Sequence, residues 1–304
     1  MLRRSLALVL VASLAALSGC SSAAASPTPR PTLAGPWKLV SQRAADPNIS
    51  IYVAGFLDET HGITVGYNGE VHYTADGGKT WPAGTNQSFC RFGLDIVSAQ
   101  AAWHCGNGGL GFSSDGGKTW TNVKGTYSTA DSFPCHFLSF LDARTGWAAT
   151  GGDLDLITNG GDTWTAIKLP AGLGGSIAAI DLRTATDGYV LDSAGAVWIT
   201  ADGGKTWTSK PLGLTGGAIA TAKLPLASMH FTDSTHGVVV ARLAGASAKL
   251  VAFRTSDGGA TWQSEQIALA LGKADLTALF LAHDGTNLTV TDTFNTVTLL
   301  RYQL

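Results

Sequence analysis

A short turn recurs along the chain, and this repeat constrains the fold more than any other feature. Its consensus is Ser/Thr-x-Asp-Gly-Gly-x-Thr-Trp, and four copies end at Trp81, Trp120, Trp207 and Trp262. A fifth, degenerate copy ends at Trp164. Successive tryptophans lie roughly 40 to 55 residues apart, which is a period typical of repeats built from a few short strands. The chain is therefore expected to be an array of similar units.

The acidic residues of these turns are predicted to be structural. They are Asp76, Asp115, Asp202 and Asp257, with Asn159 at the equivalent place in the degenerate copy. A short carboxylate can accept the free N–H groups of a tight turn, while the adjacent glycines adopt the positive φ angles that the turn needs. The Asp-Gly-Gly spacing lacks the alternating oxygen ligands of a calcium loop, so neither a metal nor a catalytic role is expected here.

The regions between the turns read as short strands, and no amphipathic helix follows the N-terminal segment. Residues 37–42 look like the strand that follows a turn, although no turn precedes them, and the last residues supply three strands without a turn. Joining the two ends completes a sixth unit. The prediction is an all-β fold, a single β-propeller of six four-stranded blades. Its N-terminal strand closes the ring and removes an exposed sheet edge.

The repeat resembles the Asp-box, or BNR-repeat, family of sialidase-type propellers. A second turn, Phe-x-Asp-x-x-x-Gly, precedes several boxes and begins at Phe56, Phe140 and Phe231. The combination is most similar to the photosystem II assembly and stability factor group of that family. The resemblance implies a rigid, non-enzymatic ring that presents loops to a partner. It also implies that the boxes lie on the face opposite the binding face.

The N-terminal segment, residues 1–19, is predicted to be a lipoprotein signal peptide. Arg3 and Arg4 precede an apolar run that is too short to span a bilayer comfortably. The run ends in Leu-Ser-Gly-Cys20, which resembles the lipobox of bacterial lipoproteins, so Cys20 is the expected lipidated N-terminus. Residues 20–36 then form a Pro/Ser/Ala-rich tether, and residues 37–304 form the propeller. The protein is expected to be extracytoplasmic and anchored to the cell membrane.

The charge balance and motif content limit the partners. The formal net charge is −2 and only 14% of the residues are charged, so no nucleic-acid partner is expected. No Cys/His cluster has metal-ligand spacing and no Gly-rich phosphate loop precedes a helix, so neither a metal nor a cofactor is predicted. The chain is expected to be a monomer whose partner is a protein or a cell-envelope glycan.

Three cysteines remain after Cys20, and in an oxidising compartment they suggest one disulfide and one leftover thiol. Cys90 and Cys135 occupy matching positions at the start of adjacent inner strands. We therefore predict a Cys90–Cys135 disulfide with Cys105 left over. The alternative pairing is Cys90–Cys105, within one blade.

The candidate binding residues lie where inner strands begin and where the second and third strands of a blade connect. Arg91 and His136 hold equivalent places, each between a cysteine and a phenylalanine, and form a candidate site for an anion or a carboxylate. The other candidates expected on this face are Tyr67, Glu70, His104, Asp153, Asp155 and Arg242. Alternatively, these side chains are solvated loop residues that satisfy backbone groups.

A glycosidase is the alternative function, because sialidases share this repeat. The resemblance to them implies an arginine triad and a Tyr nucleophile that a Glu activates. The early Phe-Arg-Ile-Pro motif of those enzymes is absent, and Arg91 is followed by Phe-Gly. The only glutamates are Glu59, Glu70 and Glu265, of which Glu70 alone is well placed. No catalytic residue is assigned, and a binding or scaffold role is favoured over a sialidase-like glycoside hydrolase or a carbohydrate-binding propeller.

Overall fold

A computed structural model describes most of the chain from residue 35 onward. The described residues are 35–44, 51–66, 69–84, 93–106, 109–123, 135–149, 152–214, 218–220, 226–244, 249–269, 275–293 and 296–303. Cys20, Tyr67, Cys90 and Arg91 lie outside them, as do the signal peptide and most of the tether. Within these ranges, no helix has the length and apolar character needed to cross a membrane.

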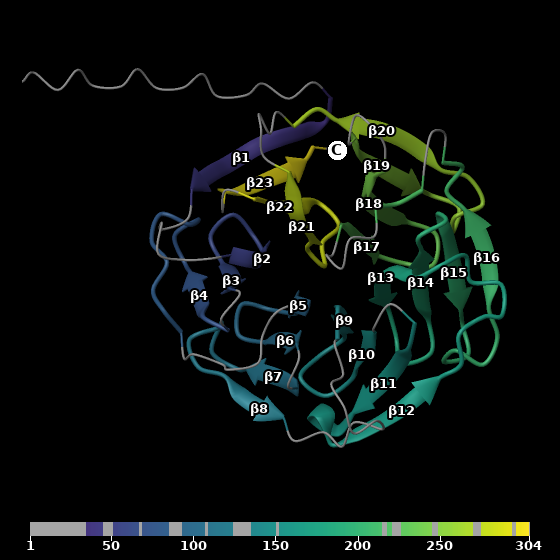
Figure 1. The fold of residues 1–304 in the computed structure, drawn as a ribbon, viewed down its shortest axis with the longest axis horizontal. Helices are drawn as coiled ribbons and strands as arrows, with labels where there is room; N and C mark the ends of the chain where they lie inside the picture. Colours follow the sequence, from purple (N-terminus) through teal and green to yellow (C-terminus); the bar gives the residue numbers. More distant parts are fainter. Residues whose placement is uncertain are drawn as a thin grey trace, which may run out of the picture. The chain divides into compact units, whose positions relative to one another are not determined.

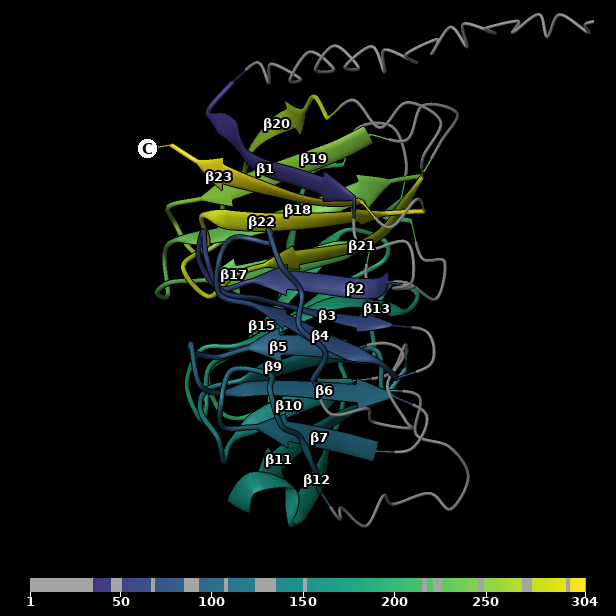
Figure 2. The same ribbon diagram turned by 90° about the vertical axis from the view of Figure 1, so that its left-hand side faces the viewer.

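Six antiparallel sheets are arranged around a common axis and form a ring (Figure 1). In five of them the strands follow one another in sequence order from the axis outward, and the sixth contains both ends of the described chain. Seen from the side, the strands run between two opposite faces of the ring (Figure 2). The predicted all-β, six-bladed propeller is confirmed.

The strand bounds follow the repeat along the chain. The first blade contains β2 (Ile51–Phe56), β3 (Gly62–Gly66) and β4 (Val71–Thr74). The second contains β5 (Gly93–Ile96), β6 (Ala102–Gly106), β7 (Gly109–Ser113) and β8 (Thr121–Val123). The third contains β9 (Phe137–Phe140), β10 (Gly146–Ala149), β11 (Leu154–Thr158) and β12 (Thr163–Ile167).

The second half of the ring has the same plan. The fourth blade contains β13 (Ile177–Leu182), β14 (Gly188–Asp192), β15 (Ala196–Thr200) and β16 (Thr208–Pro211). The fifth contains β17 (Ala227–Phe231), β18 (Gly237–Leu243), β19 (Lys249–Thr255) and β20 (Gln263–Ile267). The sixth contains β21 (Leu276–Leu281), β22 (Asn287–Asp292), β23 (Thr296–Tyr302) and β1 (Trp37–Ala44).

The N-terminal strand closes the ring, as the sequence predicts. β1 pairs antiparallel with β23, from Trp37 opposite Tyr302 to Ala44 opposite Thr296. The indole of Trp37 is 2% exposed and meets the Tyr302 ring edge-on, with the ring centroids 5.4 Å apart. The guanidinium of Arg254, from the neighbouring fifth blade, lies 3.2 Å from the centroid of the Tyr302 ring. This cation–π contact fastens the closing blade to its neighbour.

The first blade departs from the four-stranded plan. Its outer position is taken by a single bridge between His72 and Ala83, with Tyr73 N donating to Pro82 O at 3.1 Å and Gly84 N donating to Val71 O at 2.8 Å. Pro82 has no N–H to donate, so a regular fourth strand cannot continue through it. This blade is the one with the fewest strand–strand bonds among the described sheets.

The box turns are held by their own side chains. In the fourth blade, Asp202 Oδ1 accepts N–H bonds from Lys205 and Thr206, both at 2.9 Å, and Oδ2 accepts the Thr206 hydroxyl at 2.6 Å. Gly203 and Gly204 have φ angles of 73° and 84°, which glycine adopts without strain. Equivalent acceptor bonds occur at Asp76, Asp115 and Asp257. The degenerate box instead forms a 3₁₀ turn, η1 (Asn159–Gly161).

The boxes and the turns after the innermost strands lie on one face, which we call the box face. In five blades a box glycine N–H donates to a carbonyl of the turn that follows the innermost strand, over 2.8 to 3.0 Å; the carbonyls belong to Thr60, Gln100, Arg144, Thr186 and Thr235. The opposite face, where innermost strands begin and where second and third strands connect, is called the loop face. His136 and Asp153 lie on the loop face because they directly precede β9 and β11.

Candidate functional site

A cavity of about 60 Å³ lies at the centre of the ring, lined by residues of all six innermost strands. This is space for a few water molecules. Its walls combine apolar side chains with polar side chains from several blades: Asp95, His136, Ser139, Asp181, Ser228, His230 and His283. We treat this cavity and the N-terminal end of β9, on the loop face, as the candidate functional site.

Polar side chains of the inner strands connect neighbouring blades. Asp95, on β5, accepts the Phe140 N–H of β9 at 2.6 Å. The same kind of bond runs from Leu182 N to Ser139 Oγ (2.8 Å), from Phe231 N to Asp181 Oδ2 (2.7 Å), from Leu281 N to Ser228 Oγ (2.9 Å) and from Phe56 N to Thr289 Oγ1 (3.0 Å). These hydrogen bonds therefore connect adjacent blades near the axis of the ring.

Two of these carboxylates also bind histidines. His283 Nε2 lies 2.7 Å from Asp95 Oδ1, and His230 Nδ1 lies 3.2 Å from Asp181 Oδ1. The two imidazole centroids are 5.5 Å apart, so the pairs form one cluster. Burial lowers the pKa of His283, but the charge and hydrogen bond of Asp95 outweigh it, and the pKa rises to about 9. His283 is therefore an imidazolium at neutral pH.

The cluster and His136 lie at opposite ends of β9. His136 precedes the first residue of β9 on the loop face, while Asp95 contacts Phe140, its last residue. Four extended residues separate them by roughly 13 Å. His136 lines the cavity, and its N–H donates to Ala149 O at 2.9 Å. The structure thus places one predicted site residue at the cavity, with the charged cluster toward the box face.

His104 is a core residue, and the prediction that it faces the loop side is wrong. Its side chain is 2% exposed and its ring lies 4.4 Å from that of Trp120. Burial lowers the pKa of His104 to about 3, so the imidazole is neutral. The physical reason is that each blade is covered on both sides by its neighbours, so a central strand such as β6 has no solvent-facing side.

The remaining described candidates do not line the cavity. Asp153 is exposed, whereas Asp155 is 8% exposed and its pKa is raised by burial and then by the charge of Asp153. Arg242 forms an ion pair with Asp275 at 2.7 Å. Glu70 packs over Gly66, whose N–H donates to Glu70 O at 2.8 Å. All four lie toward the loop face, but the structure does not bring them together with His136.

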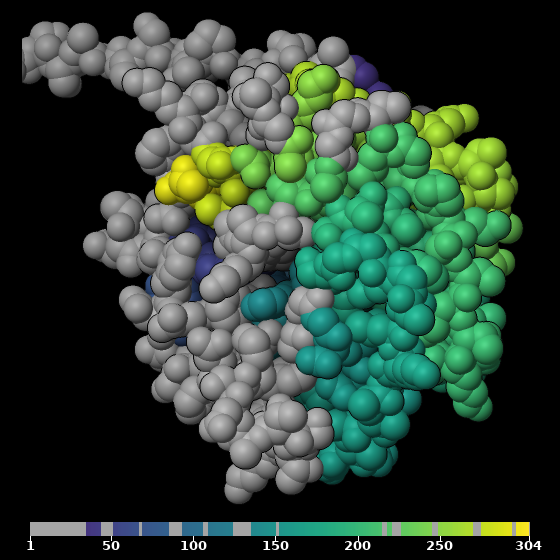
Figure 3. All heavy atoms as spheres, turned by 45° about the vertical axis from the view of Figure 1, so that its right-hand side comes forward, coloured from purple at the N-terminus to yellow at the C-terminus, as the bar shows by residue number. Residues whose placement is uncertain are grey.

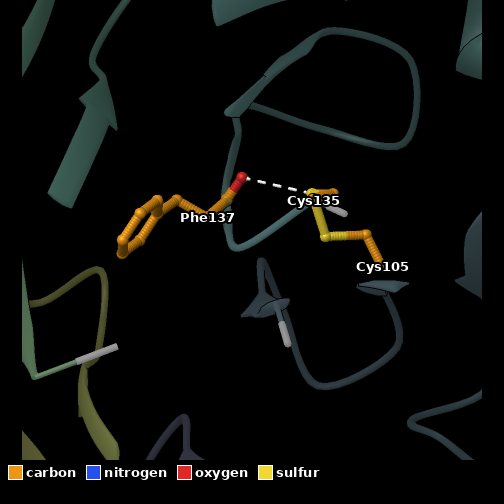
Figure 4. The surroundings of a disulfide bond; sticks show 3 residues. All are labelled: Cys105, Cys135 and Phe137. Atoms are coloured by element: carbon orange, nitrogen blue, oxygen red, sulfur yellow. Dashed lines mark hydrogen bonds between the residues drawn. A yellow bond between two sulfur atoms is a disulfide. The ribbon is translucent and has the colours of Figure 1, made fainter. Parts of the chain in front are cut away.

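The disulfide joins Cys105 to Cys135, so the predicted Cys90–Cys135 pairing and its Cys90–Cys105 alternative are both wrong (Figure 4). Cys105 lies on β6 and Cys135 lies just before β9, so the bond connects the second and third blades. Their Cα atoms are 5.7 Å apart, within the usual range for a disulfide. Both side chains are 1% exposed. The bond fixes the backbone next to His136.

Four residues of this cluster were not predicted from the sequence: Asp95, Asp181, His230 and His283. A signal for the two aspartates was present, because Leu94-Asp95-Ile96 and Ile180-Asp181-Leu182 each place a carboxylate inside an apolar strand. A buried carboxylate needs partners. Their partners could not be found from spacing, because Asp95 and His283 are 188 residues apart. Across the described residues, no group of three or more His, Cys, Asp or Glu side chains could hold a metal ion.

Comparison with protein families places the chain among known propellers. Residues 91–223 match the family described as photosynthesis system II assembly factor YCF48. Over these residues the chain is similar to that family. The resemblance predicted from the Asp boxes is thereby confirmed. A comparison with curated proteins finds no match.

Solved structures share the propeller fold of this chain. "YCF48 bound to D1 peptide" has a TM-score of 0.56 at 17% identity, covering 90% of this chain and 99% of that one. The WD40 propeller domain of Doa1 has a TM-score of 0.56 at 10% identity, covering 87% and 96%. The GH74 enzyme of Niastella koreensis has a TM-score of 0.51 at 17% identity, covering 81% of this chain but 45% of that one. At such identities the shared property is the fold.

Proposed function

We propose that this YCF48-like propeller is a non-enzymatic binding platform, anchored by a lipid on Cys20 to the outer side of the cell membrane. Its partner is a protein segment that binds at the loop face near His136. The match to an assembly-factor family supports a binding role. A polypeptide partner is supported by the similar propeller that was solved with a peptide bound.

The difference between the two faces is the observation that carries the proposal. On the box face, the box aspartates are occupied by the N–H and hydroxyl groups of their own turns. On the loop face, His136 and Phe137 line the cavity where β9 begins. Figure 3 shows the described teal and green blades packed side by side as one continuous surface. Loops positioned by such a rigid scaffold are suited to recognition.

A matched pair of histidine variants tests this assignment. His136 lies on the loop face and His236 is an exposed histidine of a box-face turn, with 60% of its side chain accessible. The full-length protein is cross-linked in membranes, purified, and its covalent partners are identified. We expect His136→Ala to reduce the yield of the partner and His236→Ala to leave it unchanged. Equal yields from both variants would move the binding site away from β9.

The lipid anchor is tested separately. Cys20→Ala removes the thiol that the lipobox-like segment presents for acylation. We expect the variant to leave the membrane fraction, because without acyl chains the chain keeps no stable anchor. A variant that remains fully membrane-bound would contradict the anchor while leaving the loop-face proposal intact.

The alternative glycosidase function is tested by a separate activity assay. The purified propeller is incubated with a sialoside substrate, and we expect no turnover. Turnover that disappears in Glu70→Gln would overturn the binding proposal in favour of a glycosidase, because Glu70 is the glutamate placed toward the loop face.

A further inference from the structure

One of the six interfaces between neighbouring blades differs from the others at the axis. Five interfaces carry the side-chain-to-backbone bonds described above. Between β2 and β5 the described residues contain no such bond. The accepting side chain at the other interfaces often belongs to the penultimate strand residue, as with Asp95, Ser139 and Asp181. In β2 this position is Gly55. We call the interface between β2 and β5 the seam. Glycine has no side chain, so Gly55 cannot accept the side-chain-to-backbone hydrogen bond found at the other interfaces.

His283 spans this seam. It lies in the turn after β21, while its partner Asp95 lies on β5, and β2 is in contact with both strands. The bond from His283 Nε2 to Asp95 Oδ1 therefore passes across the end of β2. The missing side chain at Gly55 leaves room for Phe280, since a Cβ at Gly55 would lie only 2.8 Å from that ring. The sixth blade thus covers the gap in the first and reaches the second.

We propose that the His283–Asp95 ion pair is a protonation-controlled latch that holds the seam between β2 and β5 closed. The latch matters most here because the first blade is also the three-stranded one. Its neighbours on either side are joined directly to each other only by this pair among the side-chain bonds of the described residues. This inference does not depend on the identity of the partner.

The groups around His283 set the direction of the pH response. Asp95 on β5, Asp181 on β13, Asp284 in its own turn and the His230 ring on β17 face it. Burial acts against the charged imidazole, but the three carboxylates raise its pKa from 6.5 to about 9. Because the pKa is raised, the ion pair stabilises the seam fully below pH 6.5, and this stabilisation is lost as the pH rises through about 9. Alkaline conditions are therefore expected to loosen the seam.

Hydrogen exchange of the full chain measures the seam directly. Protection of backbone amides is compared between pH 6.5 and a pH above 9, after correction for the intrinsic exchange rate. We expect protection in β2 and β5 to fall by about tenfold or more, the equivalent of one pKa unit. β13 and β17, which keep the Asp181–Phe231 bond, serve as the internal reference. An equal fall in all six blades would overturn the proposal.

Two variants separate the latch from general destabilisation. His283→Gln keeps a hydrogen-bonding side chain but no charge, and Val53 and Leu94 still pack across the seam. We expect low protection of β2 and β5 at both pH values, whereas the matched His230→Gln should keep the wild-type response. A wild-type response in His283→Gln would refute the latch. If that variant does not fold, NMR titration of His283 in the wild-type chain decides, and a midpoint near 6.5 would refute it.

Discussion

The box turns and the His–Asp pairs at the cavity both hold the ring together, but they act over very different distances along the chain. Asp202 binds Thr206, four residues away. Asp95 binds His283, which is 188 residues away and belongs to another blade. The box bonds therefore shape each blade by itself, whereas the His–Asp pairs connect different blades. Stability is expected to be distributed along the repeats, whereas ring closure depends on a few unique contacts.

The strongest test of this comparison removes the closing strand. Deleting residues 37–42 removes Trp37 and most of the β1–β23 ladder. We expect a loss of at least about 3–5 kcal/mol in unfolding free energy, the cost of truncating a buried tryptophan alone. Denaturant titration provides the measurement. A chain shortened within residues 21–34 is the control and should unfold at the wild-type denaturant concentration.

The disulfide is the next largest connection between blades. Cys105→Ala/Cys135→Ala should lower the unfolding free energy by about 2–4 kcal/mol, because the open chain gains freedom in the unfolded state. Unfolding is followed under non-reducing conditions. Cys90→Ala is the matched control and should retain the Cys105–Cys135 cross-link in peptide mapping. Loss of the cross-link in that control would instead show that Cys90 takes part in the disulfide.

A single box is expected to have a smaller effect, and the degenerate box gives a matched comparison. Asp202→Ala removes an acceptor of two backbone N–H groups, which then lack a protein partner. Asn159→Gly removes an amide whose bond to Thr163 Oγ1 is 3.4 Å long, and glycine keeps the positive φ of 55° at this position without strain. We expect Asp202→Ala to lower the melting temperature more than Asn159→Gly. The opposite order would show that the box bonds do not stabilise the blades.

The smallest effect concerns acid stability. Hydrogen bonds from Thr206 and then from the turn hold the pKa of Asp202 at about 2, below its ordinary 3.8. Because the pKa is lowered, the ionised carboxylate of Asp202 stabilises the fold above pH 3.8, and this stabilisation is lost as the pH falls through about 2. Asp202→Asn should therefore lose less stability than the wild type on acidification across this range. Parallel acid titrations followed by tryptophan fluorescence make the comparison.

The same difference in distance explains what the sequence could predict. The boxes repeat with a fixed local pattern, so the role of Asp202, the blade number and the closure by Trp37 followed from the chain alone. The Cys105–Cys135 bond could not be predicted in this way, because β6 and the N-terminal end of β9 meet only through the packing of two blades. His104 was misplaced for a related reason, since a blade strand is buried on both sides. The Asp95–His283 pair needs the closed ring before its members meet.

The central claim is that partners bind the loop face while the box face is structural. Photo-crosslinking from one exposed position on each face tests it most directly, with a photoreactive residue at Asp153 on the loop face or at Lys205 in a box turn. Both proteins are expressed in cells, irradiated and examined for covalent partners. The account predicts a specific protein adduct from position 153 and none from position 205. An adduct formed from position 205 alone would contradict it.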